Sequence, residues 1–168
     1  QAIGLGAIKA GCKFLSAYPM TPASSIMNYY AKKELDSEVV MKQADDEISA
    51  INMALGASYA GVRSMTSTSG GGLALMSETI SLLGMTEVPL VIVNVQRPGP
   101  STGLPTRQGQ GDLKFVLNIG HGEFPRIVIA PGDVEECFYE TFNAFNFAEK
   151  YQLPVFIVSD KHLAVSYK

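Results

Sequence analysis

Cysteine, histidine and tryptophan are scarce in this chain of 168 residues, which has two cysteines, two histidines and no tryptophan. Cys12 and Cys137 are far apart, and neither belongs to a C-x-x-C pair or has a histidine nearby. The residue sets that hold zinc or an iron–sulfur cluster are therefore missing, so we expect no metal ligand in this chain. Isolated cysteines are typical of the reducing cytoplasm, where we expect the protein, with both thiols packed as small apolar groups.

Charged residues are also few. They make up 17% of the chain and the net charge is −3, whereas an average protein has about a quarter charged residues. No cluster of lysine and arginine occurs, so the sequence gives no support for a nucleic-acid partner. No apolar run approaches membrane-spanning length and no signal peptide is recognisable, so no membrane partner is expected. The low charge favours either a surface covered by partner subunits or a sheet buried on both faces.

Apolar, β-branched runs alternate with helical patterns along the chain. This alternation predicts an α/β fold with a doubly wound, mostly parallel sheet and helices on both faces. Strands are expected at 14–18, 38–41, 63–67, 89–95, 126–130 and 154–159, and helices at 2–13, 23–35, 44–61, 73–83, 112–117 and 133–150. A chain of this length suits one domain.

The most informative loop is residues 97–106, RPGPSTGLPT, which follows the buried strand expected at 89–95. A loop so rich in Pro, Gly and Ser/Thr lies where open α/β sheets bind ligands, beyond the carboxyl end of a strand. Arg97 is placed there to hold a carboxylate or phosphate with two charge-assisted hydrogen bonds. The alternative is a surface crossover loop with a solvated arginine.

Two further segments could carry chemistry. Residues 18–22, YPMTP, fix their backbone with two prolines and hold the Thr21 hydroxyl beside a helix start, where Thr21 or Ser24 is expected to act as the cap. A plain turn is the alternative. Glu47 is the strongest candidate catalytic carboxylate, because it opens a helix that is expected to emerge from a buried strand. Its alternative role is to stabilise the helix dipole.

The helix that follows Glu47 is expected to bury an apolar face made of Ile48, Ile51, Leu55 and Tyr59. Residues 68–72, TSGGG, are expected to form a loop that permits close backbone approach to a ligand or a neighbouring subunit. This loop lacks the Gly-Lys-Ser/Thr ending of a phosphate-binding P-loop.

Residues 99–103, GPSTG, satisfy the G-x-S-x-G pattern, and Asp133 or Asp160 and then His162 follow in hydrolase order. A nucleophile elbow must run straight from a strand through serine into a helix, however, and here prolines and other loop residues intervene. A serine hydrolase that uses Ser101 is kept only as an alternative.

Five segments taken together carry a resemblance to a known family: YPMTP at 18–22, DDEI at 45–48, MTSTSG at 65–70, RPGPSTGLPT at 97–106 and QGDL at 110–113. In this order they resemble the α subunit of 2-oxoacid:ferredoxin oxidoreductases over nearly the whole chain. The 2-oxoglutarate type (2-oxoglutarate synthase) is the most similar, with the 2-oxoisovalerate and pyruvate types as neighbours. The resemblance implies that residues 1–168 form the pyrimidine-binding domain of a thiamine diphosphate enzyme, as a fragment of a longer subunit.

The resemblance also implies roles for individual residues. Glu47 matches the glutamate that hydrogen-bonds N1′ of the aminopyrimidine ring, and Tyr18 and Pro19 match its cofactor-binding neighbours. Thr21 matches the hydroxyl near the carboxylate and oxo groups of the substrate, and Arg97 matches the arginine that binds the substrate carboxylate. Two further cations that could meet a distal carboxylate are Arg107 and Lys114.

The remaining parts of such an enzyme are implied to lie elsewhere. No Gly-Asp-Gly…Asn motif for magnesium and diphosphate occurs here, nor a cluster-binding cysteine set. The resemblance places Mg²⁺ and the iron–sulfur clusters on partner subunits: a β subunit, with γ and δ subunits as further members. The implied reaction is oxidative decarboxylation of a 2-oxoacid with coenzyme A to an acyl-CoA, with electrons passed to ferredoxin. A non-catalytic assembly domain of the same fold is the other reading.

Overall fold

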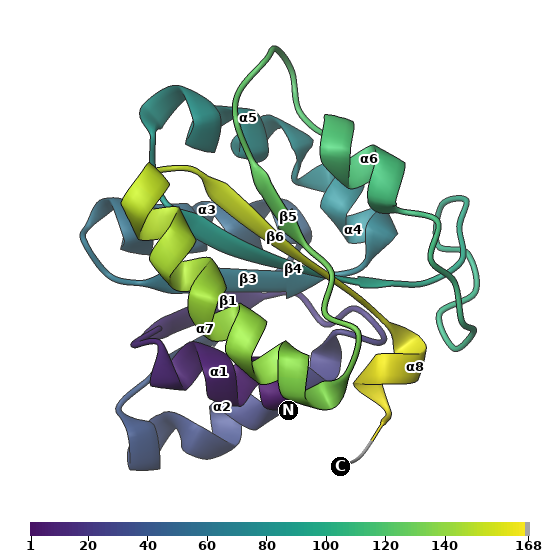
Figure 1. Ribbon diagram of the computed structural model, residues 1–168, viewed down its shortest axis with the longest axis horizontal. Coiled ribbons are helices and arrows are strands. Elements are labelled where there is room, and N and C mark those ends of the chain that lie inside the picture. The colour runs from purple at the N-terminus through teal and green to yellow at the C-terminus, as the bar shows by residue number, and fades with distance from the viewer. Residues whose placement is uncertain (167–168) are drawn as a thin grey trace.

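The computed structural model describes residues 1–166 and shows one sheet with helices on both of its faces (Figure 1). Within this described range the sheet has six strands in the order β2-β1-β3-β4-β6-β5, and all neighbouring pairs are parallel. The strands are β1 (Phe14–Ala17), β2 (Val40–Gln43), β3 (Ser64–Thr68), β4 (Leu90–Gln96), β5 (Ile127–Ile129) and β6 (Pro154–Asp160). The predicted doubly wound α/β fold is confirmed.

The helices form two layers. One face is covered by α1 (Ala2–Lys9), α2 (Ser24–Ser37) and α7 (Val134–Tyr151), and the other by α3 (Glu47–Tyr59), α4 (Gly70–Leu75), α5 (Ser77–Thr86) and α6 (Leu113–Asn118). A short helix, α8 (Lys161–Ala164), follows β6. Across residues 1–166, every helix is too short or too polar to span a membrane.

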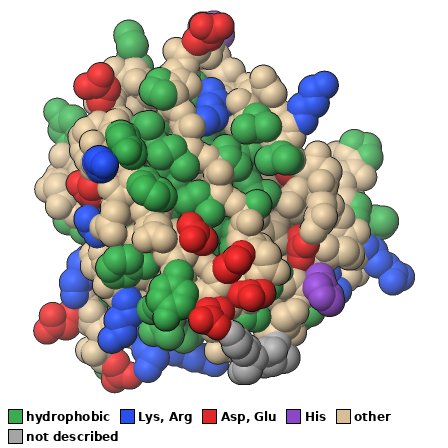
Figure 2. Space-filling view, in the orientation of Figure 1, with side chains coloured by type: hydrophobic (Ala, Val, Ile, Leu, Met, Phe, Trp, Pro, Cys, Tyr) green, Lys and Arg blue, Asp and Glu red, His purple; other side chains and the backbone are tan. Residues whose placement is uncertain are grey.

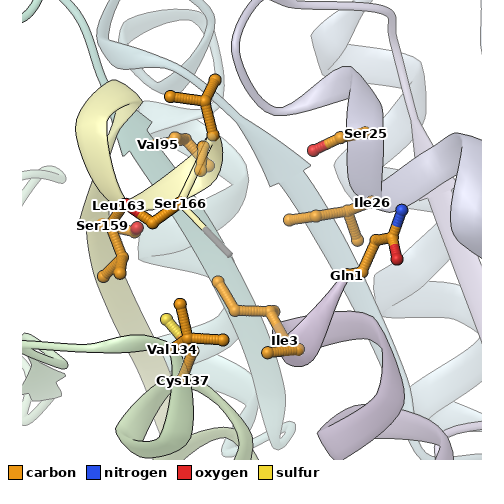
Figure 3. A pocket seen from close by; sticks show the side chains of 13 residues that line it. Gln1, Ile3, Ser25, Ile26, Val95, Val134, Cys137, Ser159, Leu163 and Ser166 are labelled. Carbon is orange, nitrogen blue, oxygen red and sulfur yellow. The ribbon is translucent and has the colours of Figure 1, made fainter. Parts of the chain in front are cut away.

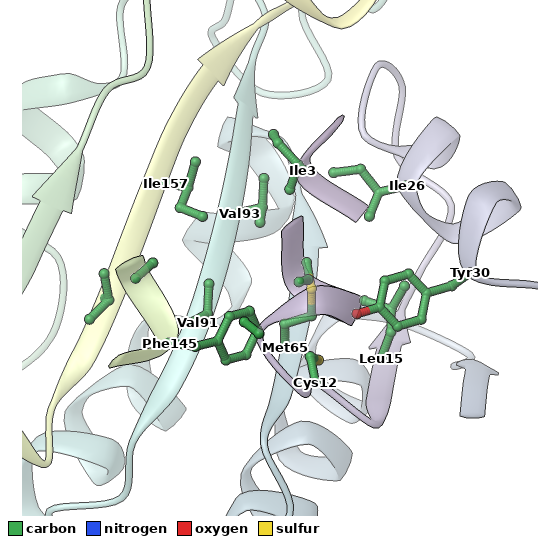
Figure 4. Close-up of a cluster of buried hydrophobic side chains, with 14 of the residues drawn as sticks. Ile3, Cys12, Leu15, Ile26, Tyr30, Met65, Val91, Val93, Phe145 and Ile157 are labelled. Carbon is green, nitrogen blue, oxygen red and sulfur yellow. The ribbon is translucent and has the colours of Figure 1, made fainter. Parts of the chain in front are cut away.

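Each face of the sheet has its own hydrophobic core. Figure 4 shows the first core, in which Ile3, Ile26 and Phe145 from the helices meet Val93 and Ile157 from the central strands. The residues of β3, β4 and β6 are all buried. Strands that are covered on both faces need apolar side chains in both directions, which explains the long apolar runs of β4 and β6. The strand β3 is an exception, because it is buried although four of its five residues are serine or threonine.

The two cysteines belong to this first core and form no disulfide, so their prediction as packed thiols is confirmed. Burial raises the pKa of Cys12 to about 12 and the pKa of Cys137 to about 11. Both thiols are therefore protonated at neutral pH.

The strand before Glu47 differs from the prediction. We expected a buried strand, but β2 is an edge strand that pairs only with β1 among the described strands and is mostly exposed. The apolar face predicted for α3 is also wrong in part, because Ile48 is 49% exposed and Tyr59 is 78% exposed.

Small residues take the inner face of α3 because the helix lies close to the sheet. The Ser16 hydroxyl donates a hydrogen bond to the carbonyl of Ala50, and the Ser64 hydroxyl donates one of 2.6 Å to the carbonyl of Ala54. Held at this range by the strand serines, α3 packs through alanine at positions 50 and 54, and Ile51 is its one large apolar side chain that is fully buried.

Two local expectations are corrected as well. Neither Thr21 nor Ser24 caps α2, since the N-cap position is Ala23 and has no side-chain hydrogen bond. Residues 70–72 lie in α4 and not in a loop.

Acidic side chains gather over the N-terminal part of α7 in Figure 2, where Asp133, Glu135 and Glu136 lie. The Asp133 carboxylate accepts a hydrogen bond of 2.8 Å from the backbone amide of Glu136 and so caps the helix. Negative charge at a helix N-terminus is stabilised by the helix dipole, so this cluster has a structural explanation.

Candidate active site

The carboxyl ends of β1, β3 and β4 lie beside one another at one edge of the sheet, because these strands are parallel neighbours. The loop after β1 carries Thr21, and Arg97 follows β4 directly. The guanidinium of Arg97 donates a hydrogen bond of 2.8 Å from Nη1 to the backbone carbonyl oxygen of Thr21. The structure therefore brings these two predicted site residues into contact.

Arg97 is not the solvated arginine of a surface loop. Its side chain is only 7% exposed, and its Nε atom has no hydrogen-bond partner among the described residues. A buried donor without a partner is costly unless a bound group accepts from it. Thr21 beside it is exposed.

Glu47 is the first residue of α3 and is only 4% exposed. The cap of this helix is the preceding residue: the Asp46 carboxylate accepts a hydrogen bond of 2.7 Å from the amide of Ser49. Helix stabilisation therefore does not require Glu47. Its Oε1 atom is buried and has no hydrogen-bond partner within residues 1–166.

The carboxylate of Glu47 lies against the start of α4. A Cβ atom placed on Gly72 would stand 2.7 Å from Oε1 of Glu47 and 2.2 Å from Oγ1 of Thr68. Thr68 is the last residue of β3. Glu47 begins the helix that follows the edge strand β2. Its side chain nevertheless reaches the end of β3, which is the neighbour of the strand that precedes Arg97.

The two glycines before Gly72 contact the loop that follows β4. A Cβ on Gly70 would stand 2.7 Å from Oδ2 of Asp112, and one on Gly71 would stand 3.2 Å from the carbonyl oxygen of Ser101. None of the three glycines has a positive φ, and each costs a helix about 1 kcal/mol relative to alanine. The groups that approach these glycines belong to this same chain, so the expected approach of a ligand or a neighbouring subunit stays a prediction.

The loop between β4 and α6 is bound to the sheet by two polar residues of β4, Asn94 and Gln96, which were not predicted as site residues. Asn94 donates a hydrogen bond of 2.9 Å to the carboxylate of Asp112, and the backbone amide of Asp112 donates one of 2.9 Å to the side-chain oxygen of Gln96. Asn94 and Gln96 are buried. Two amide side chains in an otherwise apolar strand were the signal that could have found them.

A second anchor joins the same loop to the end of β6. Gln110 donates a hydrogen bond of 2.5 Å to the carboxylate of Asp160, and the side-chain oxygen of Gln108 accepts one of 2.7 Å from the backbone amide of His162. Burial opposes the charge of Asp160, but the hydrogen bonds from the Leu163 amide and Gln110 outweigh it and lower its pKa. The carboxylate is therefore ionised at neutral pH and can accept the hydrogen bond from Gln110.

Other predicted residues lie on the loops around this edge. Tyr18 and Pro19 are exposed and follow β1 directly, while Arg107 and Lys114 are exposed on and after the loop that follows β4. Their expected contacts with cofactor or substrate remain predictions.

The hydrolase alternative gains no support from the geometry. Asp133 caps α7, and Asp160 caps α8 by accepting a hydrogen bond of 2.8 Å from the amide of Leu163. Both aspartates that could orient His162 are therefore engaged elsewhere. Ser101 lies in an exposed loop and not in a strand-to-helix turn.

A cavity of about 430 Å³ lies near the carboxyl ends of β4 and β6, and a second of about 470 Å³ lies near the carboxyl ends of β5 and β6. The first is bordered by Ile26 on one side and Ser159 on the other, with Ile3 and Cys137 between them (Figure 3). Neither cavity is lined by Thr21, Glu47 or Arg97. Thr21 is exposed, whereas Glu47 and Arg97 are buried, and completion of the site by a partner stays a prediction.

The residues fit one part of thiamine diphosphate and not the other. A buried carboxylate oxygen without a partner, as in Glu47, suits a ring nitrogen that carries or exchanges a proton. No group of three His, Cys, Asp or Glu side chains that could hold a metal ion occurs in the part of the chain that the structure describes. The assignment of Mg²⁺ and the diphosphate to a partner subunit stays a prediction.

Comparison with known proteins agrees with this geometry. Residues 5–167 match the sequence model of the family described as pyruvate flavodoxin/ferredoxin oxidoreductase, thiamine diphosphate-binding. The α subunit of a 2-oxoacid:ferredoxin oxidoreductase from Saccharolobus solfataricus is 49% identical, over 99% of this chain and 28% of that protein. The 2-oxoglutarate synthase subunit KorA from Methanocaldococcus jannaschii is 45% identical, over 96% of this chain and 44% of that protein.

A solved structure has the same fold. The 2-oxoglutarate:ferredoxin oxidoreductase from Magnetococcus marinus, with 2-oxoglutarate, coenzyme A and succinyl-CoA bound, matches with a TM-score of 0.94 and 51% identity. The match covers 97% of this chain and 28% of that one. The chain thus spans less than half the length of each of these relatives.

Proposed function

Because the chain belongs to the pyruvate flavodoxin/ferredoxin oxidoreductase family, as its thiamine diphosphate-binding domain, we propose that it supplies the pyrimidine-binding half of the active site of a 2-oxoacid:ferredoxin oxidoreductase. The proposed substrate is 2-oxoglutarate, and the products are succinyl-CoA, carbon dioxide and reduced ferredoxin. In this proposal residues 1–168 form one domain of a longer subunit. The names of the relatives, among them 2-oxoglutarate synthase, support this choice of substrate.

One observation carries the proposal: Oε1 of Glu47 is buried without a hydrogen-bond partner among the described residues. The chemistry that thiamine diphosphate supplies when bound is a carbon nucleophile for the 2-oxo group, together with an acceptor for the electron pair left by decarboxylation. Glu47 would hold and exchange a proton at N1′ of the aminopyrimidine. A domain that served only for assembly would have no use for a buried carboxylate that lacks a partner. Tyr18 and Pro19 would border the same ring.

Arg97 and Thr21 would bind the substrate. The guanidinium already donates one hydrogen bond to the Thr21 carbonyl, which fixes its plane and leaves other N–H groups to bind a carboxylate. The Thr21 hydroxyl would donate to the carboxylate or the oxo group. Arg107 and Lys114 are the cations within this domain that we assign to the distal carboxylate.

The rest of the enzyme would come from partners. Mg²⁺ and the diphosphate would be held by a β subunit, which would also carry iron–sulfur clusters, with γ and δ subunits as further members. The relatives are named as α subunits, which supports a multi-subunit enzyme. Two buried cysteines without a disulfide support a reducing, cytoplasmic location.

The test uses the assembled enzyme with a panel of 2-oxoacids, coenzyme A and a viologen acceptor. We expect reduction of the viologen that depends on coenzyme A and is fastest with 2-oxoglutarate. In the Glu47→Gln variant, exchange of the C2 proton of bound thiamine diphosphate, followed by NMR in deuterated buffer, should slow by about a hundredfold or more. Exchange at the wild-type rate would show that Glu47 is only a charge at a helix terminus.

A further inference from the structure

Gly72 occupies a position where a side chain does not fit. Its missing Cβ would stand 2.7 Å from Oε1 and 2.8 Å from Cγ of Glu47, and 2.2 Å from Oγ1 of Thr68. All three residues are buried. Atoms that are not bonded to each other do not approach this closely in well-packed interiors, so any larger residue here must displace one of its neighbours.

The backbone does not require glycine at this position. Gly72 lies within the helix α4 and has no positive φ, so alanine would adopt the same conformation more readily. Space is therefore the reason for the glycine. Gly56, inside α3, provides the contrast, because a Cβ there would have nothing within 4 Å among the described residues.

The two neighbours of Gly72 differ in how easily they can move. Thr68 is β-branched and sits at the end of a fully buried central strand, so its side chain has little freedom. The carboxylate of Glu47 lies at the end of a longer and more flexible side chain. Its Oε1 atom has no hydrogen-bond partner within the described chain that would hold it in place. A methyl group at position 72 would therefore move the Glu47 carboxylate.

We propose that Gly72 is a positioning residue that sets where the Glu47 carboxylate lies. Without a side chain, Gly72 leaves the carboxylate seated against Thr68 and the first turn of α4. This inference rests on the proposed function, because the position of the carboxylate matters only if Glu47 meets the cofactor. The other two glycines at the start of α4 lie against Asp112 and Ser101 and not against Glu47.

The experiment measures C2 proton exchange of bound thiamine diphosphate in the assembled enzyme, for Gly72→Ala, Glu47→Gln and the double variant. A displacement of about one ångström at a reacting group costs about a hundredfold in rate, so Gly72→Ala should exchange about a hundredfold more slowly than the wild type. The double variant should be no slower than Glu47→Gln alone. The matched control Gly56→Ala should exchange at the wild-type rate. Calorimetry of cofactor binding should show little change in any variant.

A second pair of variants covers the case in which Gly72→Ala does not fold. Thr68→Ala removes the hydroxyl that gives the tightest contact, so Thr68→Ala/Gly72→Ala retains only the contact with Glu47. We expect the C2 proton of the bound cofactor to exchange more slowly in the double variant Thr68→Ala/Gly72→Ala than in Thr68→Ala alone.

The outcomes separate the two proposals. Slow exchange in Glu47→Gln together with wild-type exchange in Gly72→Ala would overturn the role of Gly72 and leave the proposed function standing. An equal further loss from Gly72→Ala in the Glu47→Gln background would also overturn it, since Gly72 would then act through another group. Wild-type exchange in Glu47→Gln would overturn the catalytic assignment of Glu47 and the inference with it.

Discussion

Arg97 and Thr21 are 76 positions apart in the chain, and yet Nη1 of the arginine lies 2.8 Å from the backbone carbonyl oxygen of the threonine. The contact joins the loop after β1 to the loop after β4 across the strand that separates them, β3. A buried guanidinium that is already held on one side is preorganised for a planar anion on its other side.

Arg97→Lys should weaken substrate binding in the assembled enzyme. An ammonium group is a point charge and cannot keep the bond to Thr21 while also forming two parallel bonds to a carboxylate. Loss of a charged hydrogen bond costs about 1.5–3 kcal/mol, so we expect kcat/KM for the 2-oxoacid to fall by about tenfold to a hundredfold. Steady-state kinetics would measure this, and cofactor affinity should be unchanged.

The control for this substitution is Arg63→Lys. Arg63 precedes β3 at the opposite edge of the sheet and donates to the carbonyl of Ala10. The Arg63→Lys substitution should leave kcat/KM for the 2-oxoacid within about twofold of the wild type. If Arg97→Lys behaved in the same way, Arg97 would have no part in substrate binding.

Asp160→Ala should loosen the loop that carries Arg97. The substitution removes the acceptor for Gln110 and the cap of α8, and a bond to a charged acceptor contributes about 1.5–3 kcal/mol. Backbone amides in residues 97–112 should then exchange with solvent about tenfold faster or more. Hydrogen exchange followed by mass spectrometry would locate the change.

Asp133→Ala is the matched control, because the Asp133 carboxylate also caps a helix, and its hydrogen bond is to the backbone amide of Glu136 in α7 and not to this loop. It should destabilise α7 by about 1 kcal/mol and leave exchange in residues 97–112 unchanged. Equal effects of the two substitutions on the loop would mean that Asp160 acts only through general stability.

The stability of the protein should fall above pH 9, in part because of Cys12. Burial raises the pKa of this thiol from its ordinary 9.0 to about 12, so the folded state keeps a proton that the unfolded state releases. The contribution is fully present below pH 9 and is lost as the pH rises towards 12. Denaturant unfolding at a series of pH values should show a shallower fall for Cys12→Ala than for the wild type. If the free energy of unfolding fell equally with pH in both proteins, the raised pKa of Cys12 would make no contribution.

The isolated chain should not bind thiamine diphosphate tightly, with or without magnesium. Its residues 1–166 contain no group of three acidic, cysteine or histidine side chains that could hold a metal, and most of the charge of the cofactor is on its diphosphate. Isothermal titration calorimetry on this chain alone tests the expectation. Tight binding that depends on magnesium would refute the assignment of the diphosphate site to a partner.

The part of the fold that depends on local pattern was predictable. The run from Leu90 to Gln96 is apolar enough to identify a central strand, and parallel strands place the loops that follow them at one edge. This reasoning predicts that Thr21, Glu47 and Arg97 lie around one cleft at the carboxyl ends of adjacent strands. The structure brings Arg97 and Thr21 into contact, but none of the three residues lines either cavity. The same reasoning did not predict the bond between Gln110 and Asp160, because residues 50 positions apart leave no local signal.

The helical conformation of residues 70–72 could not be read from the sequence either. Three glycines favour a loop by intrinsic propensity, and only the neighbours that face them explain why the helix begins there. The exposure of Ile48 and Tyr59 has a similar origin, since the close approach of α3 to the sheet decides which of its faces is buried.

The order of the strands governs when the site can form during synthesis. The chain produces β4 and β5 before β6, but β6 lies between them and pairs with β4 along its whole length, from Leu90 to Gln96. Until residues 154–160 have left the ribosome, one side of β4 is therefore an open apolar edge, of the kind that recruits other chains. The strand that precedes Arg97 therefore gains its second neighbour late, and a newborn chain exposes this edge to other chains until β6 has been made.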